Sequence, residues 1–193
     1  MKDLNDDDKM VLIALHNGAQ VSIQFSTGAC PFGIKFADTG IYECPRRAYG
    51  IFNRNPAARP YTEDGMMMAP VSEWLDFPVE RAGPKDYAYR SPVHIKPSAA
   101  GAIAALAAEF RDRPLSNPEK NALRDAAGPG IMKRHRDSGF GVEWYICGDK
   151  VHRRKVIYGL CLRGLLTRAE DGRIVANEAG RLAVAPALVA PCA

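Results

Sequence analysis

Residues 148–182 read GDKVHRRKVIYGLCLRGLLTRAEDGRIVANEAGRL, and this stretch decides the fold expected for the second half of the chain. Its first part, residues 150–163, places Val156, Leu160 and their apolar neighbours at helical spacing, which predicts a helix with one buried stripe. Gly164 follows the last periodic residue, and helices commonly end at a glycine because glycine tolerates a positive φ.

The next residues predict a hairpin and a short helix. Residues 165–168 and 173–176 are strand-like runs, and the Glu-Asp-Gly sequence at 170–172 between them is typical of a tight turn. Asn177 can accept a hydrogen bond from the backbone at the start of a helix, so we expect a last short helix over residues 178–184. The expected order is therefore helix, two-stranded hairpin, helix.

This order is that of the second half of a winged helix. The runs RGLLTR, DGRI and NEAGR resemble the winged helix-turn-helix family, whose members often read arginine-glycine-leucine, a polar hairpin, and threonine-x-x-glycine-arginine. Asn177 stands where the threonine is usual, and both residues are good helix caps. The resemblance covers residues 117–185. It implies a DNA-binding or regulatory protein of a bacterium or its phage, with a DNA-contacting helix near 150–163 and a wing near 167–176.

The first half of the chain has a different pattern. Three segments alternate apolar and polar residues, which predicts a small antiparallel meander with one buried face. These segments are residues 21–25, 32–36 and 41–44. The apolar residues 10–15 fit a helix and a buried strand equally well. Eight prolines in residues 45–97 exclude long helices there, yet the segment is apolar enough to favour an ordered, loop-rich structure packed on the meander.

Two helices are expected next. Residues 98–113 carry apolar side chains at helical spacing, and residues 117–127 follow a serine that can cap them, with a proline and an acid in the first turn. The segment 131–147 is ambiguous. Residues 133–139 fit one turn of the helix that a standard winged helix has there, whereas residues 140–146 fit a strand.

We therefore expect an α+β protein of two parts. Residues 1–96 are expected to form a mixed region, with a small antiparallel sheet and proline-rich loops. Residues 97–193 are expected to form helices and a winged-helix-like domain, with the apolar tail 185–193 folded back or at an interface.

The positive charge of the chain is unevenly distributed. The net charge of +4 arises from 26 Lys and Arg against 22 Asp and Glu. Residues 117–185 carry 13 basic against 8 acidic residues, a net +5, whereas residues 1–116 carry 13 against 14, a net −1. The excess lies in the winged-helix-like half, as expected for a nucleic-acid-binding surface.

Two basic runs supply the candidate binding residues. Residues 133–136 read KRHR, and residues 150–155 read KVHRRK at the start of the predicted helix. Cations are unfavourable at a helix N-terminus, and a DNA phosphate would offset that cost. Such runs are ordinarily a solvated surface, but here they coincide with the expected DNA-contacting helix. We expect nucleic-acid contacts from Lys133, Arg134, Arg136, His152, Arg153, Arg154, Lys155, Tyr158, Arg168 and Arg173.

These residues are expected to play different roles. On a helical wheel, Lys155 and Tyr158 face solvent and would reach base edges, whereas Lys133 and the arginines would hold phosphates. Arg168 and Arg173 flank the tip of the wing. The acidic pair at 170–171 opposes entry of that tip into a minor groove, which favours binding by the helix alone or a winged helix that binds protein.

Motifs for catalysis, metal binding and export do not occur. The five cysteines are scattered without a CxxC pair, and a site formed by Cys30 and Cys44 with His16 or His94 lacks the usual ligand spacing. No phosphate loop, GxSxG or HExxH motif occurs, so we expect no enzyme, no cofactor and no metal. The acidic N-terminus and the lack of a long apolar segment predict a cytoplasmic protein outside the membrane.

Two classes of partner remain open. Duplex DNA is favoured, and DNA binding predicts a continuous positive face around Arg154 and Lys155. The alternative is a phage-encoded inhibitor of a host defence system, similar to an anti-CRISPR, that binds a host protein complex. That role predicts an exposed apolar patch, with Trp74 and the methionines at 66–68 as candidates. Homodimerisation is a further expectation, by analogy with winged-helix proteins.

Overall fold

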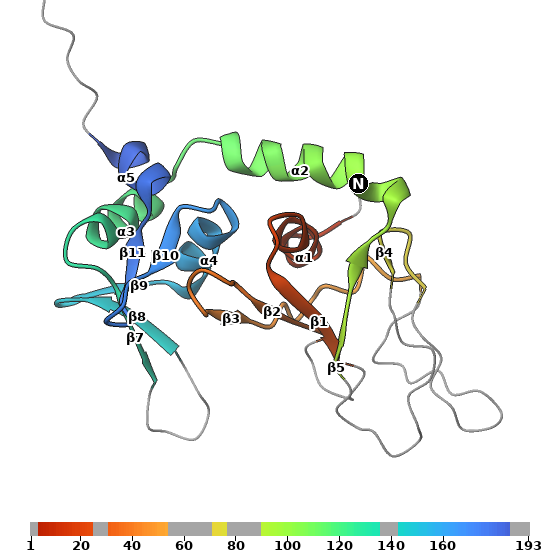
Figure 1. The fold of residues 1–193 in the computed structure, drawn as a ribbon, viewed down its shortest axis with the longest axis horizontal. Helices are drawn as coiled ribbons and strands as arrows, with labels where there is room; N and C mark the ends of the chain where they lie inside the picture. Colours follow the sequence, from red (N-terminus) through yellow and green to blue (C-terminus); the bar gives the residue numbers. More distant parts are fainter. Residues whose placement is uncertain (1–3, 25–30, 54–70, 77–89, 136–142, 186–193) are drawn as a thin grey trace, which may run out of the picture. The chain divides into compact units, whose positions relative to one another are not determined.

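The chain divides into two compact units, Met1–Asp112 and Arg113–Ala193. A computed structural model describes residues 4–24, 31–53, 71–76, 90–135 and 143–185. Five α-helices and several small antiparallel sheets in these residues confirm the α+β class (Figure 1). The sequence places a boundary after residue 96, whereas in the structure α2 (Ala100–Asp112) belongs to the first unit, where it packs against α1 (Asp6–His16).

The α1 helix resolves the ambiguity of residues 10–15, and it does so through its first turn. Asn5 caps the helix, since its side-chain oxygen accepts hydrogen bonds from the backbone N–H groups of Asp7 (2.8 Å) and Asp8 (3.0 Å). The Asp8 carboxylate accepts the backbone N–H of Asn5 in return at 3.0 Å, which completes a capping box. Local capping therefore selects the helix that periodicity alone leaves open.

The predicted meander is confirmed as part of a four-stranded antiparallel sheet with the order β3-β2-β1-β5. Val21 on β1 lies opposite Ile34 on β2, and both side chains are buried. The α1 helix packs on β1 and β2 (Figure 1). The sequence gives no signal for β5, because it is short and includes Pro92, a residue tolerated at a sheet edge. The four strands are β1 (Gln20–Gln24), β2 (Phe32–Lys35), β3 (Tyr42–Glu43) and β5 (Arg90–Pro92).

The segment that follows the meander packs on the core of the first unit. The Gly50 backbone N–H donates to Oδ1 of Asp8 at 3.0 Å. A Cβ atom at Gly50 would lie 2.5 Å from Oδ2 of Asp8, so this close approach requires glycine. The ring of Phe52 stacks on that of Phe32, with centroids 5.3 Å apart. In these residues the expected ordered loop is confirmed.

Two short strands complete the first unit. β4 (Leu75–Asp76) pairs antiparallel with β6 (His94–Ile95). A single 3₁₀ turn, Pro97–Ala99, then leads into α2. The methionines at 66–68, expected as part of an exposed patch with Trp74, lie outside the described residues.

In the second unit a three-stranded antiparallel sheet, β7-β8-β9, follows α3 (Asn117–Ala127). The strands are β7 (Met132–His135), β8 (Glu143–Cys147) and β9 (Lys150–His152). The structure decides between the alternatives for residues 131–147, because residues 133–135 pair with β8 and do not form the helical turn. The predicted start of the next helix at residue 150 is wrong. Cys147 pairs with Lys150 across a two-residue turn in which Gly148 has φ +56°, so residues 150–152 continue as a strand.

The helix, hairpin and short helix predicted over residues 154–184 are confirmed, whereas the apolar tail expected to fold back or lie at an interface falls outside the described residues from 186 onward. α4 (Arg154–Leu162) is followed by Gly164 with φ +65°, and the hairpin β10 (Leu166–Arg168) and β11 (Ile174–Ala176) turns at Gly172 with φ +84°. An isolated bridge between Ile131 and Ile174 connects this hairpin to the segment that precedes β7. α5 (Glu178–Val184) begins as expected at Asn177, whose side chain accepts from the backbone N–H of Gly180 at 2.9 Å.

Candidate nucleic-acid interface

The first turn of α4 is the candidate interface. Arg153 is the N-cap residue, with φ −66° and ψ 136°, and its side chain makes no capping hydrogen bond. The first turn contains no acidic residue, whereas α1 has three there and α3 and α5 have one each. Because backbone N–H groups make a helix N-terminus partly positive, cations at this point repel their own helix end. The charge arrangement at the start of α4 is therefore locally unfavourable.

Three consecutive basic residues are exposed at this turn: Arg153, Arg154 and Lys155. In the described part of the chain, no hydrogen bond or ion pair engages the side chains of Arg153 and Lys155. Arg154 is held along the helix, because its Nε donates to the hydroxyl of Tyr158 and its guanidinium carbon lies 5.1 Å from the centre of that ring. The turn thus presents two cations that no described side chain or backbone group engages, beside one that is fixed in direction.

Tyr158 does not face solvent, so the orientation expected from the helical wheel is wrong. Only 2% of this residue is exposed, and its ring meets that of Tyr145 edge-on at 6.2 Å with an interplanar angle of 78°. The helical wheel assumes one buried stripe, but α4 packs against α3, β8 and β10, and every residue from Ile157 to Leu162 is buried. Only the first turn of this helix remains for a ligand.

His152 has a structural role in place of the expected surface contact. Its Nε2 lies 3.1 Å from Oδ2 of Asp125, and 9% of its side chain is exposed. The other carboxylate oxygen, Oδ1, accepts a hydrogen bond from Nζ of Lys150 at 2.8 Å, which raises the pKa of that ammonium group. Asp125 therefore ties β9 to α3, and the strand that leads into α4 is fixed through two side chains.

The wing hairpin is largely neutralised. Nε of Arg173 donates to Oδ2 of Asp171 at 2.6 Å, and its Nη1 donates to the carbonyl of Pro129 at 2.6 Å. The hydrogen bond between Arg173 and Asp171 holds the pKa of Asp171 below its usual range and raises the pKa of Arg173. Arg168, on β10, is exposed. In the wing, the charge of Arg173 is thus balanced by Asp171, whereas Arg168 is open to solvent.

The remaining basic run is not brought to the α4 turn by any described contact. Lys133 is half-buried on β7, in register with Tyr145. Arg134 pairs with Trp144 in the same register, but its side chain, like the whole of Arg136, lies outside the described residues. The structure therefore gathers Arg153, Arg154 and Lys155, and it separates His152, Tyr158 and Arg173 from that group by burial or by pairing.

A buried cluster supports the opposite end of α4. Glu119 accepts from Nη2 of Arg113 at 2.7 Å and from the backbone N–H of Ser116 at 2.9 Å, while Nη1 of Arg163 lies 3.9 Å away. Burial raises the pKa of Glu119, but the hydrogen bonds from Ser116 and the charges of the two arginines outweigh it, so the pKa is lowered. A Cβ atom at Gly159 would lie 3.3 Å from Oε1 of Glu119, and this glycine lets the carboxylate approach the helix.

An exposed apolar row crosses the β7-β8-β9 sheet. Met132 lies opposite Ile146, and Ile146 lies opposite Val151, so their side chains share one face. Met132 is 48% exposed and Val151 is 56% exposed. Sequence reasoning missed this row because it left residues 133–139 open between helix and strand and predicted a helix from residue 150. The alternation of strand residues would have indicated it.

No protein-family model matches the chain, and neither a curated protein nor a solved structure matches it. Among the residues that the structure describes, no group of three or more His, Cys, Asp or Glu side chains is arranged to hold a metal ion. No helix in the same residues is long and apolar enough to cross a bilayer.

Proposed function

We propose that the second unit binds the phosphate backbone of duplex DNA through the first turn of α4, with a winged-helix-like arrangement in which Arg153, Arg154 and Lys155 make the main contacts. The observation that carries this proposal is the cluster of three exposed cations on a helix N-terminus without an acid. A phosphate accepts hydrogen bonds from free backbone N–H groups and neutralises the cations at once. Arg168 on the wing provides a further phosphate contact.

The charge of the two units supports this assignment. The second unit carries 14 Lys and Arg against 8 Asp and Glu, a net charge of +6. The first unit carries 12 against 14, a net charge of −2. A domain that binds nucleic acid concentrates positive charge in this way, and long-range attraction then adds to the direct contacts.

The proposed binding depends weakly on DNA sequence. Tyr158 is buried and His152 is paired with Asp125, so neither reaches a base edge. A strand, β9, leads into α4 where a helix-turn-helix has a helix and a turn. Contacts to phosphates position a protein on DNA but carry no sequence information by themselves. Sequence-independent binding is therefore expected from this turn.

The test is the affinity for a random-sequence duplex at two salt concentrations. Four phosphate contacts, from Arg153, Arg154, Lys155 and Arg168, predict an affinity about 150-fold lower at about 200 mM than at about 50 mM salt. Arg153→Glu/Lys155→Glu removes two of the contacts and should abolish measurable binding, whereas Lys120→Glu/Arg124→Glu on α3 changes the charge of the same unit equally and should retain most of it. No binding at low salt, or equal loss in both double variants, would contradict the proposal.

A protein-binding role is the second candidate, and the apolar row of Met132, Ile146 and Val151 favours it. Arg153 and Lys155 follow β9 directly, so the matching partner is a protein surface with apolar side chains and acidic neighbours, as in an anti-CRISPR-like inhibitor of a host complex. Met132→Gln/Val151→Thr keeps strand-compatible residues and should abolish capture of a stoichiometric host complex, with DNA affinity unchanged. If the captured complex is the same with the wild type and this variant, the row is not the contact surface.

A further inference from the structure

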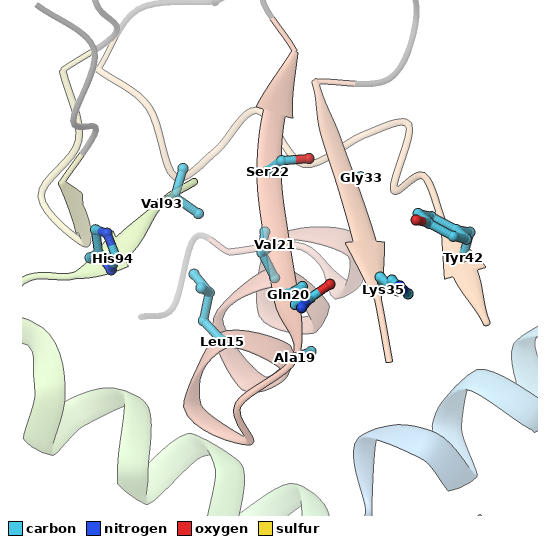
Figure 2. Close-up of a pocket in the computed structure, with 10 residues that line it drawn as sticks. All are labelled: Leu15, Ala19, Gln20, Val21, Ser22, Gly33, Lys35, Tyr42, Val93 and His94. Carbon is cyan, nitrogen blue, oxygen red and sulfur yellow. The ribbon is translucent and has the colours of Figure 1, made fainter. Parts of the chain in front are cut away.

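The first unit contains a pocket of about 610 Å³ over the sheet β3-β2-β1-β5, between the end of α1 and the segment around β6 (Figure 2). Gln20, Ser22, Lys35 and His94 contribute polar side chains to it, and Tyr42 contributes a ring. Small-molecule sites usually measure about 300–1,000 Å³. We propose that this pocket binds a small organic anion, with Lys35 and His94 as the polar contacts to its charge and an apolar or aromatic body against the strand surface.

The charge of the lining points to an anion. Of the described residues that line the pocket, two are basic, Lys35 and His94, and none is acidic. Within the described part of the chain, the side chains of Gln20, Ser22 and His94 make no hydrogen bond or ion pair. They are therefore available to a ligand, and a carboxylate or phosphate group satisfies donors of this kind.

The lining also has an aromatic and apolar surface, which suits a ligand larger than a simple ion. The Tyr42 residue is 47% exposed, and Nζ of Lys35 lies 6.0 Å from the centre of its ring. Leu15 and Val93 add apolar surface on the opposite side of β1 (Figure 2). An aromatic ring stacked on Tyr42 would place a substituent charge near Lys35. An inorganic ion uses only the polar part of this surface, so an anion with an apolar body binds more tightly.

Gly33 is the second, independent indication. It lies opposite Ser22 in the β1–β2 register, so a side chain at this position would point to the pocket face. Its Cβ would meet only Oγ of Ser22, at 3.5 Å, so neither packing nor a positive φ requires glycine here. A glycine inside a strand weakens that strand, and it often marks a place where a ligand approaches the backbone closely. The missing side chain keeps the floor of the pocket open.

The test is titration of the isotope-labelled full-length chain with phenyl phosphate and with 3-phenylpropionate, followed by NMR. Benzyl alcohol serves as the neutral control and inorganic phosphate as the control without an apolar body. Saturable shifts of the Ser22, Gly33 and Lys35 amides with at least one aromatic anion, at least tenfold weaker with both controls, would support the proposal. The anion that binds more tightly, phenyl phosphate or 3-phenylpropionate, shows whether the pocket prefers a phosphate or a carboxylate.

Variants make the test specific to the pocket. Lys35→Met should weaken binding at least tenfold, and Gly33→Leu should abolish it by filling the floor, while Lys120→Met in the second unit should leave it unchanged. Gly33→Ala adds one methyl group that meets no steric conflict, so it provides a folded, partly blocked variant if the leucine disturbs the sheet. No saturable shift with either anion, or equal binding of benzyl alcohol, would overturn the proposal.

Discussion

The helices α3 and α4 of the second unit begin in opposite ways. The start of α3 is closed by its own residues, because the Glu119 carboxylate accepts hydrogen bonds from the backbone and side chain of Ser116 and pairs with Arg113. The start of α4 has Arg153 as an N-cap without a side-chain bond, followed by two more cations. Within the described residues, a capping box closes the first of these N-termini, whereas the N-cap side chain of the second makes no capping hydrogen bond. This difference indicates which end is structural and which end suits a ligand.

The largest expected effect on stability comes from removing the Glu119 carboxylate at the start of α3. Glu119→Gln leaves the guanidinium groups of Arg113 and Arg163 without their carboxylate and should lower the free energy of unfolding by about 2–3 kcal/mol, near the low end for a broken buried pair because Arg113 is half-exposed. Urea unfolding in a Trp74→Phe background, in which Trp144 of β8 is the remaining tryptophan, measures the second unit. Glu170→Gln on the exposed wing is the matched control and should change little. A loss below about 0.5 kcal/mol would show that α3 does not depend on this closure.

The same contact predicts a pH dependence. The pKa of Glu119 is lowered in the folded state, so the unfolded chain takes up the proton first as the pH falls. The stability that Glu119 provides is therefore complete above its unfolded pKa and is lost as the pH drops through the lower folded value. Unfolding measured from about pH 7 to about pH 3 should show the wild type converging on Glu119→Gln. A constant difference across that range would contradict the assignment.

A third N-terminus in the unit, that of α5, provides an intermediate case. Asn177 accepts from the Gly180 N–H at 2.9 Å and donates through Nδ2 to the carbonyl of Gly164 at 2.7 Å. Asn177→Ala should cost about 1 kcal/mol of stability, measured by the same fluorescence. Asn177→Thr retains a capping oxygen and should recover most of that loss. If threonine is no better than alanine, the bond to Gly164 matters more than the cap.

The smallest expected effect comes from closing the open end. Arg153→Asp places an acceptor and a negative charge at the start of α4 and should raise stability by about 0.5–1 kcal/mol. It should at the same time weaken DNA binding, because a phosphate and a carboxylate compete for the same N–H groups. Arg153→Gln, which supplies no negative charge, should weaken DNA binding without raising stability. A loss of stability with aspartate would mean that the turn is not short of an acceptor.

The correct sequence predictions share a local cause. Asn177, Gly164 and Gly172 each act within a few residues of their own position, and each is found in the expected conformation. The alternating runs of the meander are also decided locally, since side chains two residues apart must share a face. Caps, turns and periodicity of this kind require no knowledge of distant contacts, and they fixed most elements of both units.

The wrong predictions involve partners far away in the chain. Tyr158 faces solvent on an isolated helix, but β8 brings Tyr145 over that face. His152 belongs to a basic run in the sequence, and only the fold brings it to Asp125. In the wing, the sequence predicts that the negative charge of Asp171 opposes DNA entry. The structure shows instead that Asp171 pairs with Arg173, which leaves this arginine less available for a phosphate. The sequence thus predicts which part of the chain contains the candidate site, but tertiary contacts decide which residues belong to it.

The link from Asp125 to Lys150 and His152 bears on the kinetics expected for the proposed DNA binding. Because one carboxylate fixes the strand that leads into α4, the backbone of the cationic turn is already ordered before a ligand arrives. A preordered site loses little conformational entropy on association, so its affinity is expressed mainly as a slow rate of departure. Loosening this anchor would leave every cation of the turn in place and would still shorten the lifetime of the proposed complex.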